Sequence, residues 1–126
     1  MQNFDVIVVG GGPAGYNSAE YAAHHGKKVL LVEKKSLGGT CLNVGCIPTK
    51  TLLYSAKILD SIKSASKYGI VAMKDPSFDL AKIIDRKNKT VRKLTLGVKA
   101  RLTGNGVTIV EGEARITGEE FGNIRI

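Results

Sequence analysis

The chain has few of the side chains from which metal sites are built. Its 126 residues include two cysteines and two histidines. Cys41 and Cys46 stand five residues apart, and His24 and His25 are adjacent to each other near the expected end of a helix. Tetrahedral zinc needs four ligands that converge on one point, and this spacing does not offer them. We therefore expect no metal site and place both histidines on the surface.

Acidic residues are also scarce. The chain has 11 aspartates and glutamates but 19 lysines and arginines, which gives it a net charge of +8. Much of the excess lies within residues 82–101, where one acid, Asp85, accompanies a run of basic side chains. These are Lys82, Arg86, Lys87, Lys89, Arg92, Lys93, Lys99 and Arg101. No aromatic residues interleave with these charges, as a platform for stacking nucleic-acid bases requires. We expect a solvated helix face balanced by acids elsewhere in a longer protein, and no nucleic-acid partner.

The sequence shows no internal repeat, no low-complexity tract and no signal peptide. Its first apolar stretch is too short for a secretion signal and merges with a glycine run. We therefore expect a cytoplasmic protein without a membrane partner. Thiols in the cytosol are normally reduced, so a bridge between Cys41 and Cys46 would be catalytic more readily than structural. A structural bridge, or two buried thiols, remains the alternative.

Both cysteines lie in residues 38–50, which read Gly-Gly-Thr-Cys-Leu-Asn-Val-Gly-Cys-Ile-Pro-Thr-Lys. Five residues of regular helix separate two Cα atoms by roughly 8–9 Å, whereas a disulfide needs roughly 4.4–6.8 Å. If the cysteines bond to each other, residues 41–46 must form a tightened turn. Gly45 tolerates unusual backbone angles and Pro48 lacks an amide donor, so the local sequence permits the bridge. A short, strained bridge is easier to reduce than a structural one.

A second motif precedes the cysteines. The apolar, β-branched run at residues 4–9 predicts a buried parallel strand. It leads into a glycine-rich turn that fits G-x-G-x-x-G, Gly10-Gly11-Gly12-Pro13-Ala14-Gly15. These glycines allow a tight turn, the approach of a pyrophosphate, and close packing of the next helix, whose N-terminus faces the phosphates. A helix over about 13–25 and a strand over 28–33 follow, and Glu33 stands where a ribose hydroxyl needs an acceptor.

The remainder of the chain predicts two long helices and several short strands. The helices span about residues 49–67 and 79–102, with Asp79 as a cap. Short strands at 107–111, 114–117 and 123–126 suggest a β-meander. We therefore expect an α/β, Rossmann-like domain: a parallel sheet core with flanking helices and a meander, incomplete at 126 residues.

The glycine loop and the cysteine segment together resemble the N-terminal part of the FAD-dependent pyridine nucleotide–disulfide oxidoreductases, and most closely the dihydrolipoamide dehydrogenases among them. The resemblance covers nearly the whole chain. It implies that residues 1–126 are the N-terminal portion of an FAD-binding domain, with the NAD and dimerisation domains absent. FAD would be the cofactor, and NAD would accept electrons in the full-length enzyme. We expect the 126-residue chain alone to be inactive.

The resemblance also implies roles for individual residues. Cys46 would lie against the flavin, Cys41 would exchange with the substrate disulfide, and Lys50 would sit near the reactive flavin nitrogen. The turn at 112–114 would meet the adenine edge through Ala114. The cofactor-binding residues that follow are Gly10, Gly12, Pro13, Ala14, Gly15, Glu33, Lys34, Gly38, Gly39, Thr40, Lys50 and Ala114. Binding of an NADP phosphate by Lys34 and Lys35 is an alternative that we rank below FAD.

Two positions help to choose among members of the family. Glutathione-type reductases carry arginine where this chain has Glu20, and lysine where it has Thr49. Because Glu20 would repel a substrate carboxylate, the lipoamide interpretation is favoured. It implies a dihydrolipoyl substrate on a lipoyl-bearing protein of a 2-oxoacid dehydrogenase or glycine cleavage complex, and a homodimer at full length. The alternatives are a glutathione- or mercuric-type reductase and a non-catalytic FAD-binding module.

Overall fold

The core of the protein is a three-stranded parallel sheet. A computed structural model describes residues 2–71, 75–120 and 123–125. The strands are β1 (Val6–Val9), β2 (Val29–Glu33) and β3 (Thr108–Glu111), with β2 in the middle. Val6 pairs with Val29, and Glu33 pairs with Glu111. The sheet therefore ends in acids at the carboxyl end of β2 and β3, the edge at which parallel-sheet proteins bind ligands.

Helix α1 (Pro13–His24) connects β1 to β2. Proline at its start suits a helix N-terminus, because no intrahelical partner is available there for the missing N–H. Gly26 follows the helix with φ +73°, a left-handed conformation that glycine adopts without steric cost. These local signals place α1 where the sequence predicts it, and its Ala19 is fully buried.

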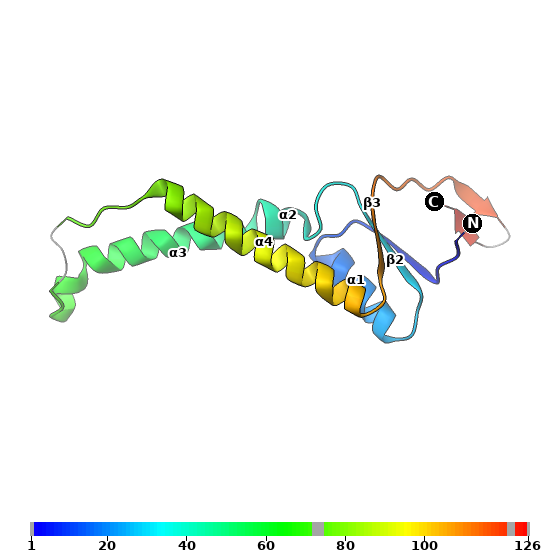
Figure 1. Cartoon of the computed structure of the whole chain (residues 1–126), viewed down its shortest axis with the longest axis horizontal. Coiled ribbons are helices and arrows are strands. Elements are labelled where there is room, and N and C mark those ends of the chain that lie inside the picture. The colour runs from blue at the N-terminus through cyan, green and yellow to red at the C-terminus, as the bar shows by residue number, and fades with distance from the viewer. Residues whose placement is uncertain (1, 72–74, 121–122, 126) are drawn as a thin grey trace.

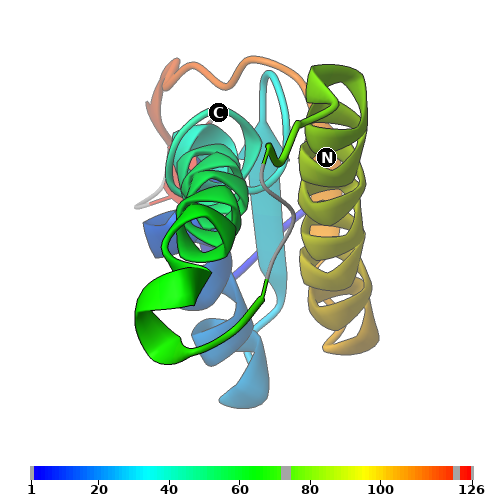
Figure 2. The same cartoon turned by 90° about the vertical axis from the view of Figure 1, so that its left-hand side faces the viewer.

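The connection from β2 to β3 is long and helical. It runs through α2 (Gly39–Asn43), α3 (Cys46–Lys63), a 3-10 turn (Ala65–Tyr68) and α4 (Leu80–Gly104). The carboxylate of Asp79 caps α4 by accepting a hydrogen bond of 3.0 Å from the amide of Lys82, as predicted. Helices α3 and α4 lie side by side and extend together away from the sheet as a two-helix arm (Figures 1 and 2).

Buried side chains lie where α1 and the end of α4 cover one face of the sheet. The cluster consists of Ala19, Val29, Leu31, Leu102 and Val107. Val29 and Leu31 alternate along β2 and so share this face, as the period of two in a strand requires. Leu102 brings α4 onto them, which fixes the root of the arm against the sheet.

The class predicted from the sequence, α/β with a parallel core, is confirmed, but the expected meander differs. Residues 108–111 join the parallel sheet as β3, because the helical crossover returns the chain alongside β2. Residues 114–117 are not a strand; the antiparallel hairpin begins later, with β4 (Gly118–Glu120) pairing to β5 (Asn123–Arg125). Ile126, included in the last predicted strand, lies outside the described residues.

Two helix boundaries also differ from prediction. Helix α3 begins at Cys46 rather than at residue 49 and ends at Lys63, where a 3-10 turn takes over. Helix α4 continues two residues past the predicted end, to Gly104. In the part of the chain that the structure describes, no helix combines the length and apolar character needed to cross a membrane.

Replacing Leu102 tests the packing of α4 on the sheet. Leu102 is 0% exposed, so Leu102→Ala should lower the free energy of unfolding by about 2–5 kcal/mol. Leu96→Ala on the same helix is the matched control, because Leu96 is 54% exposed and its truncation should have a much smaller effect. Urea unfolding followed by circular dichroism measures both. Equal losses of stability in the two variants would contradict the burial described here.

Candidate nucleotide-binding and redox site

The glycine loop between β1 and α1 has the form of a phosphate cradle. Gly10 has φ +101°, and its amide donates to the carbonyl of Val32 at 2.8 Å. A Cβ on Gly15 would overlap the carbonyl oxygen of Gly10, so only glycine lets α1 approach the strand this closely. A Cβ on Gly12 would have one neighbour, the Cα of Gly39 at 3.9 Å. The space beside Gly12 suits the approach of a phosphate group.

Glu33 stands at the end of β2 beside this loop. Its two carboxylate oxygens accept hydrogen bonds of 2.7 Å from the amides of Gly11 and Lys35. Partial burial raises the pKa of the Glu33 carboxyl, but the backbone amides of Lys35, Gly11, Ser36 and Lys34 outweigh it and hold the pKa below its usual value. Glu33 is therefore an ionised acceptor at the mouth of the glycine loop.

The turn after β3 lies next to Glu33. The amide of Gly112 donates to the Glu33 carbonyl at 2.9 Å, which joins the ends of β2 and β3. Ala114, two residues further on, is half-buried. The turn at 112–114, predicted to meet an adenine edge, therefore begins with a residue that is hydrogen-bonded to Glu33, the predicted ribose acceptor.

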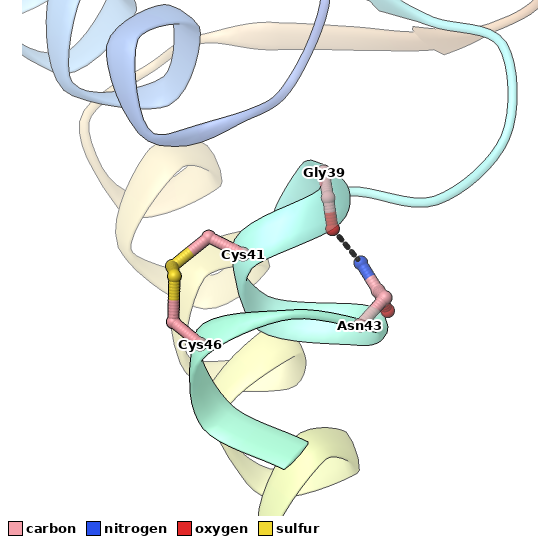
Figure 3. The surroundings of a disulfide bond; sticks show 4 residues. All are labelled: Gly39, Cys41, Asn43 and Cys46. Carbon is pink, nitrogen blue, oxygen red and sulfur yellow. Dashed lines mark hydrogen bonds between the residues drawn. A yellow bond between two sulfur atoms is a disulfide. The ribbon is translucent and has the colours of Figure 1, made fainter. Parts of the chain in front are cut away.

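Cys41 and Cys46 are joined by a disulfide across a tight turn (Figure 3). Their Cα atoms are 4.6 Å apart, because α2 ends at Asn43 and α3 begins at Cys46. The carbonyl of Thr40 accepts from the amides of Val44 at 3.0 Å and Gly45 at 2.7 Å, which folds the chain back on itself. The predicted interruption of helical geometry is confirmed. We call residues 38–46 the redox turn.

The redox turn and the glycine loop are in direct backbone contact. The amide of Gly38 donates to the carbonyl of Gly11 at 2.8 Å. A Cβ on Gly39 would lie 2.7 Å from the Cα of Gly12, closer than real Cβ atoms come to backbone. Gly38 and Gly39 also have φ values of +97° and +59°, which favour glycine. Two motifs separated in sequence therefore form one compact unit, joined by direct backbone contact.

The other predicted site residues are accessible from solvent. Pro13 and Ala14 are exposed at the start of α1, and Thr40 is exposed in the redox turn. Lys34 and Lys50 are exposed as well, and Lys50 lies one helical turn after Cys46. Of the two cysteines, Cys46 is exposed and Cys41 is half-buried.

Sequence reasoning missed the structural part played by Asn43. Its side-chain amide donates to the carbonyls of Leu37 at 3.0 Å and Gly39 at 2.9 Å. The available signal was the crowding of backbone carbonyls in a glycine-rich turn, each of which needs a donor. Asn43 is the amide side chain nearest to them in sequence.

Arg86 is exposed, as expected for a solvated helix face, but it also makes contacts that the sequence did not show. Its guanidinium donates to the carbonyl of Thr51 at 2.6 Å and to the hydroxyl of Ser55 at 3.0 Å. Arg86 therefore fastens α4 to the first turns of α3, the helix that begins at Cys46. Sequence periodicity cannot show this, because the contact depends on how the two helices pack.

Several other basic residues of α4 pair with acids. The Nζ atom of Lys82 lies 3.4 Å from a carboxylate oxygen of Asp79, and the Nζ atom of Lys89 lies 2.7 Å from a carboxylate oxygen of Asp85. Arg101 reaches across to α1 and binds Glu20, with 2.8 Å between Nε and the carboxylate. Glu20 is thus directed toward α4, and its charge is compensated within the chain.

The histidines are exposed, and His24 lies 2.9 Å from the side-chain oxygen of Asn105. Within the described ranges, no three histidine, cysteine or acidic side chains are grouped closely enough to hold a metal ion.

A family model described as pyridine nucleotide-disulphide oxidoreductase matches residues 4–123. The chain belongs to this family. Its relatives in the family include proteins named dihydrolipoyl dehydrogenase, which are 48% identical over 114 residues in Mycoplasma pneumoniae, 50% over 117 in Chlorobaculum parvum and 47% over 115 in Bacillus subtilis. These alignments cover 90%, 93% and 90% of this chain but 25% of each relative. The chain therefore spans about a quarter of the length of the curated relatives it matches.

A solved structure of similar fold is that of the HOCl-induced flavoprotein disulfide reductase RclA from Escherichia coli, studied as a Cu(II) complex. It superimposes with a TM-score of 0.68 at 29% identity, over 86% of this chain and 22% of that one. The fold of this chain, a parallel sheet with flanking helices, therefore agrees with its membership of the family.

Replacing Gly15 tests how closely α1 approaches the glycine loop, with Gly97 in α4 as the control. Gly97→Ala in α4 meets no atom within 4 Å and should stabilise the protein by about 0.5–1 kcal/mol, because alanine favours helix. Gly15→Ala in α1 should instead destabilise it by about 1–3 kcal/mol, because the new methyl overlaps the Gly10 carbonyl. Urea unfolding measures both variants. Stabilisation by Gly15→Ala would contradict the close approach of helix and loop.

Proposed function

We propose that this chain carries the FAD-binding loop and the redox disulfide of an FAD-dependent disulfide oxidoreductase that oxidises a dihydrolipoyl dithiol and passes electrons to NAD. The observation that carries the proposal is the contact between the glycine loop and the redox turn, in which the Gly38 amide lies 2.8 Å from the Gly11 carbonyl. This contact would keep a nucleotide cofactor and the disulfide in one site. The relatives named dihydrolipoyl dehydrogenase support the choice of substrate.

The residues around the loop fit an FAD. Gly10, Gly12 and Gly15 would hold its pyrophosphate at the N-terminus of α1, with Pro13 and Ala14 alongside. Glu33, an ionised acceptor, would bind the adenosine ribose beside Lys34, and Ala114 would meet the adenine. Gly38, Gly39, Thr40 and Lys50 would contact the flavin half. Bound there, the flavin would supply a carrier that can take two electrons from the cysteine pair and pass them on as a hydride, a transfer that the cysteines alone do not perform.

The cysteines would perform the dithiol exchange. A substrate thiolate attacks the Cys41 sulfur, the bond between Cys41 and Cys46 breaks, and Cys46 leaves as a thiolate. The second substrate thiol then attacks the mixed disulfide and releases Cys41, so the substrate leaves as a cyclic disulfide. Two electrons have moved to the cysteine pair, and the two substrate thiol protons have gone to the cysteines or to solvent.

The position of Cys46 favours its thiolate. Cys46 is the first residue of α3, an 18-residue helix whose unpaired N-terminal amides stabilise negative charge. The ammonium of Lys50, one turn further along, adds positive charge nearby. The Cys46 sulfur would therefore be the electron-donating member of the pair, and Cys41 the member that exchanges with substrate.

The environment of Glu20 supports a lipoyl substrate rather than glutathione. A glutathione-type site needs a positive side chain at this position to pair with the tripeptide carboxylate, whereas Glu20 is an acid already bound to Arg101. We further propose that the full-length protein is a cytoplasmic homodimer acting on the lipoyl-bearing protein of a 2-oxoacid dehydrogenase or glycine cleavage complex. The 126-residue chain by itself would bind FAD weakly and would not turn over.

Protection of Cys46 by FAD tests the proposal. In the reduced chain without cofactor, iodoacetamide should alkylate exposed Cys46 faster than half-buried Cys41. Saturating FAD should slow the alkylation of Cys46 at least severalfold and leave Cys41 reactive, because the flavin would cover one sulfur. Peptide mass spectrometry measures the two rates separately.

ADP is the matched control, because it fills the nucleotide half of the site without a flavin ring and should leave Cys46 reactive. Equal protection by ADP, or none by FAD, would refute the proposed arrangement. A monomeric chain that holds stoichiometric FAD through a sizing column would contradict the expected weak binding.

A further inference from the structure

Helix α2 is too short to be stable without help from its surroundings. It comprises five residues, Gly39–Asn43, whereas isolated helices of fewer than about 12 residues are marginal in water. Its first residue is Gly39, and glycine is a poor helix former. The φ of Gly39 is +59°, which lies in the left-handed region and not in that of a right-handed helix. Something other than α2 itself must therefore keep this segment closed between the glycine loop and Cys46.

The side chain of Asn43 closes this segment. Its amide nitrogen has two hydrogens, and each is donated to a backbone carbonyl, of Leu37 at 3.0 Å and of Gly39 at 2.9 Å. Carbonyl oxygens only accept, so the atom that faces both of them must be the nitrogen. Both bonds are partly buried, which raises the cost of leaving the carbonyls without a donor.

The carbonyls held by Asn43 belong to the segment that contacts the glycine loop. Leu37 and Gly39 flank Gly38, whose amide binds Gly11. Asn43 itself lies between the two cysteines in sequence, and its side chain lies on the opposite side of the turn from the disulfide (Figure 3). Asn43 thus touches neither sulfur, yet it connects the two parts of the site through the backbone.

We propose that Asn43 is a positioning residue that holds the redox turn closed and thereby favours the disulfide over the dithiol. Breaking an S–S bond of about 2.05 Å removes the covalent link between the two ends of the turn, so the reduced turn is free to open. The hydrogen bonds of Asn43 hold residues 37–43 in the geometry from which the Thr40 carbonyl, through the amides of Val44 and Gly45, brings the chain back to Cys46. They would therefore stabilise the oxidised geometry more than the reduced one. The inference rests on the proposed function only in treating the Cys41–Cys46 pair as redox-active.

The test is the redox equilibrium of the cysteine pair in the 126-residue chain without flavin. Dithiothreitol reduces the protein disulfide to two thiols and is itself oxidised to its cyclic disulfide, so no other reactant is needed. Acid quenching, alkylation and mass spectrometry give the ratio of the two protein forms. Asn43→Ala should shift the equilibrium constant toward the dithiol by about fivefold, the factor expected from one net hydrogen bond of average strength.

Two further variants separate hydrogen-bond donation from other effects. Asn43→Asp has nearly the same shape but cannot donate when ionised, so it should shift the constant at least as far as alanine does. Asn88→Ala is the control: Asn88 lines the same surface groove of α4 as Asn43, and its oxygen accepts from Lys87. Its equilibrium constant should match that of the unmodified chain.

Unchanged constants in both Asn43 variants would overturn the proposal while leaving the proposed function intact, because FAD protection of Cys46 is measured separately. If neither variant folds, the unmodified chain decides. By NMR, the side-chain amide protons of Asn43 should exchange with solvent at least about tenfold more slowly than those of an exposed amide such as Asn88. Equal exchange rates would overturn the proposal.

Discussion

The rest of the site depends on the backbone contact between the glycine loop and the redox turn. Gly12 and Gly39 approach so closely that a Cβ on Gly39 would lie 2.7 Å from the Cα of Gly12. No other residue type could occupy that position without moving one segment away from the other. The glycine loop and the redox turn therefore act as one structural element, although helix α1 and strand β2 separate them in sequence.

Helix α2, which carries Cys41, lies between the sheet and the two-helix arm (Figure 1). Helix α3 leaves the redox turn at Cys46, and α4 returns to the core, where Leu102 is fully buried. Arg86 joins the two helices near the start of α3 through the carbonyl of Thr51. The position of Cys46 therefore depends both on the contact between the glycine loop and the redox turn and on the packing of α3 against α4.

Local signals made much of this structure predictable. The strand, glycine loop, helix and terminal Glu33 could be located because each is encoded within a few residues, by apolar runs and by glycines that a tight turn requires. The interruption of helix between the cysteines followed from the reach of a disulfide alone. The exposed histidines and the Asp79 cap were likewise local properties.

What could not be predicted depends on long-range packing. Residues 108–111 read as part of a meander, yet they pair with β2 because α4 carries the chain back across the sheet. Arg86 read as one charge in a solvated run, and its bonds to α3 exist only once the helices meet. Asn43 was passed over because the sequence shows an amide beside a glycine-rich turn but not which carbonyls it reaches, and these are located only in space.

The unity of the glycine loop and the redox turn can be measured by NMR on the isotopically labelled, oxidised chain during titration with ADP. ADP contains the pyrophosphate and ribose that the loop and Glu33 fit, and it has no flavin ring to reach the cysteines. The amide signals of Gly10, Gly11 and Gly12 should shift with those of Gly38 and Gly39, along one binding curve. Shifts confined to the glycine loop, with Gly38 and Gly39 unchanged at saturation, would contradict the arrangement described here.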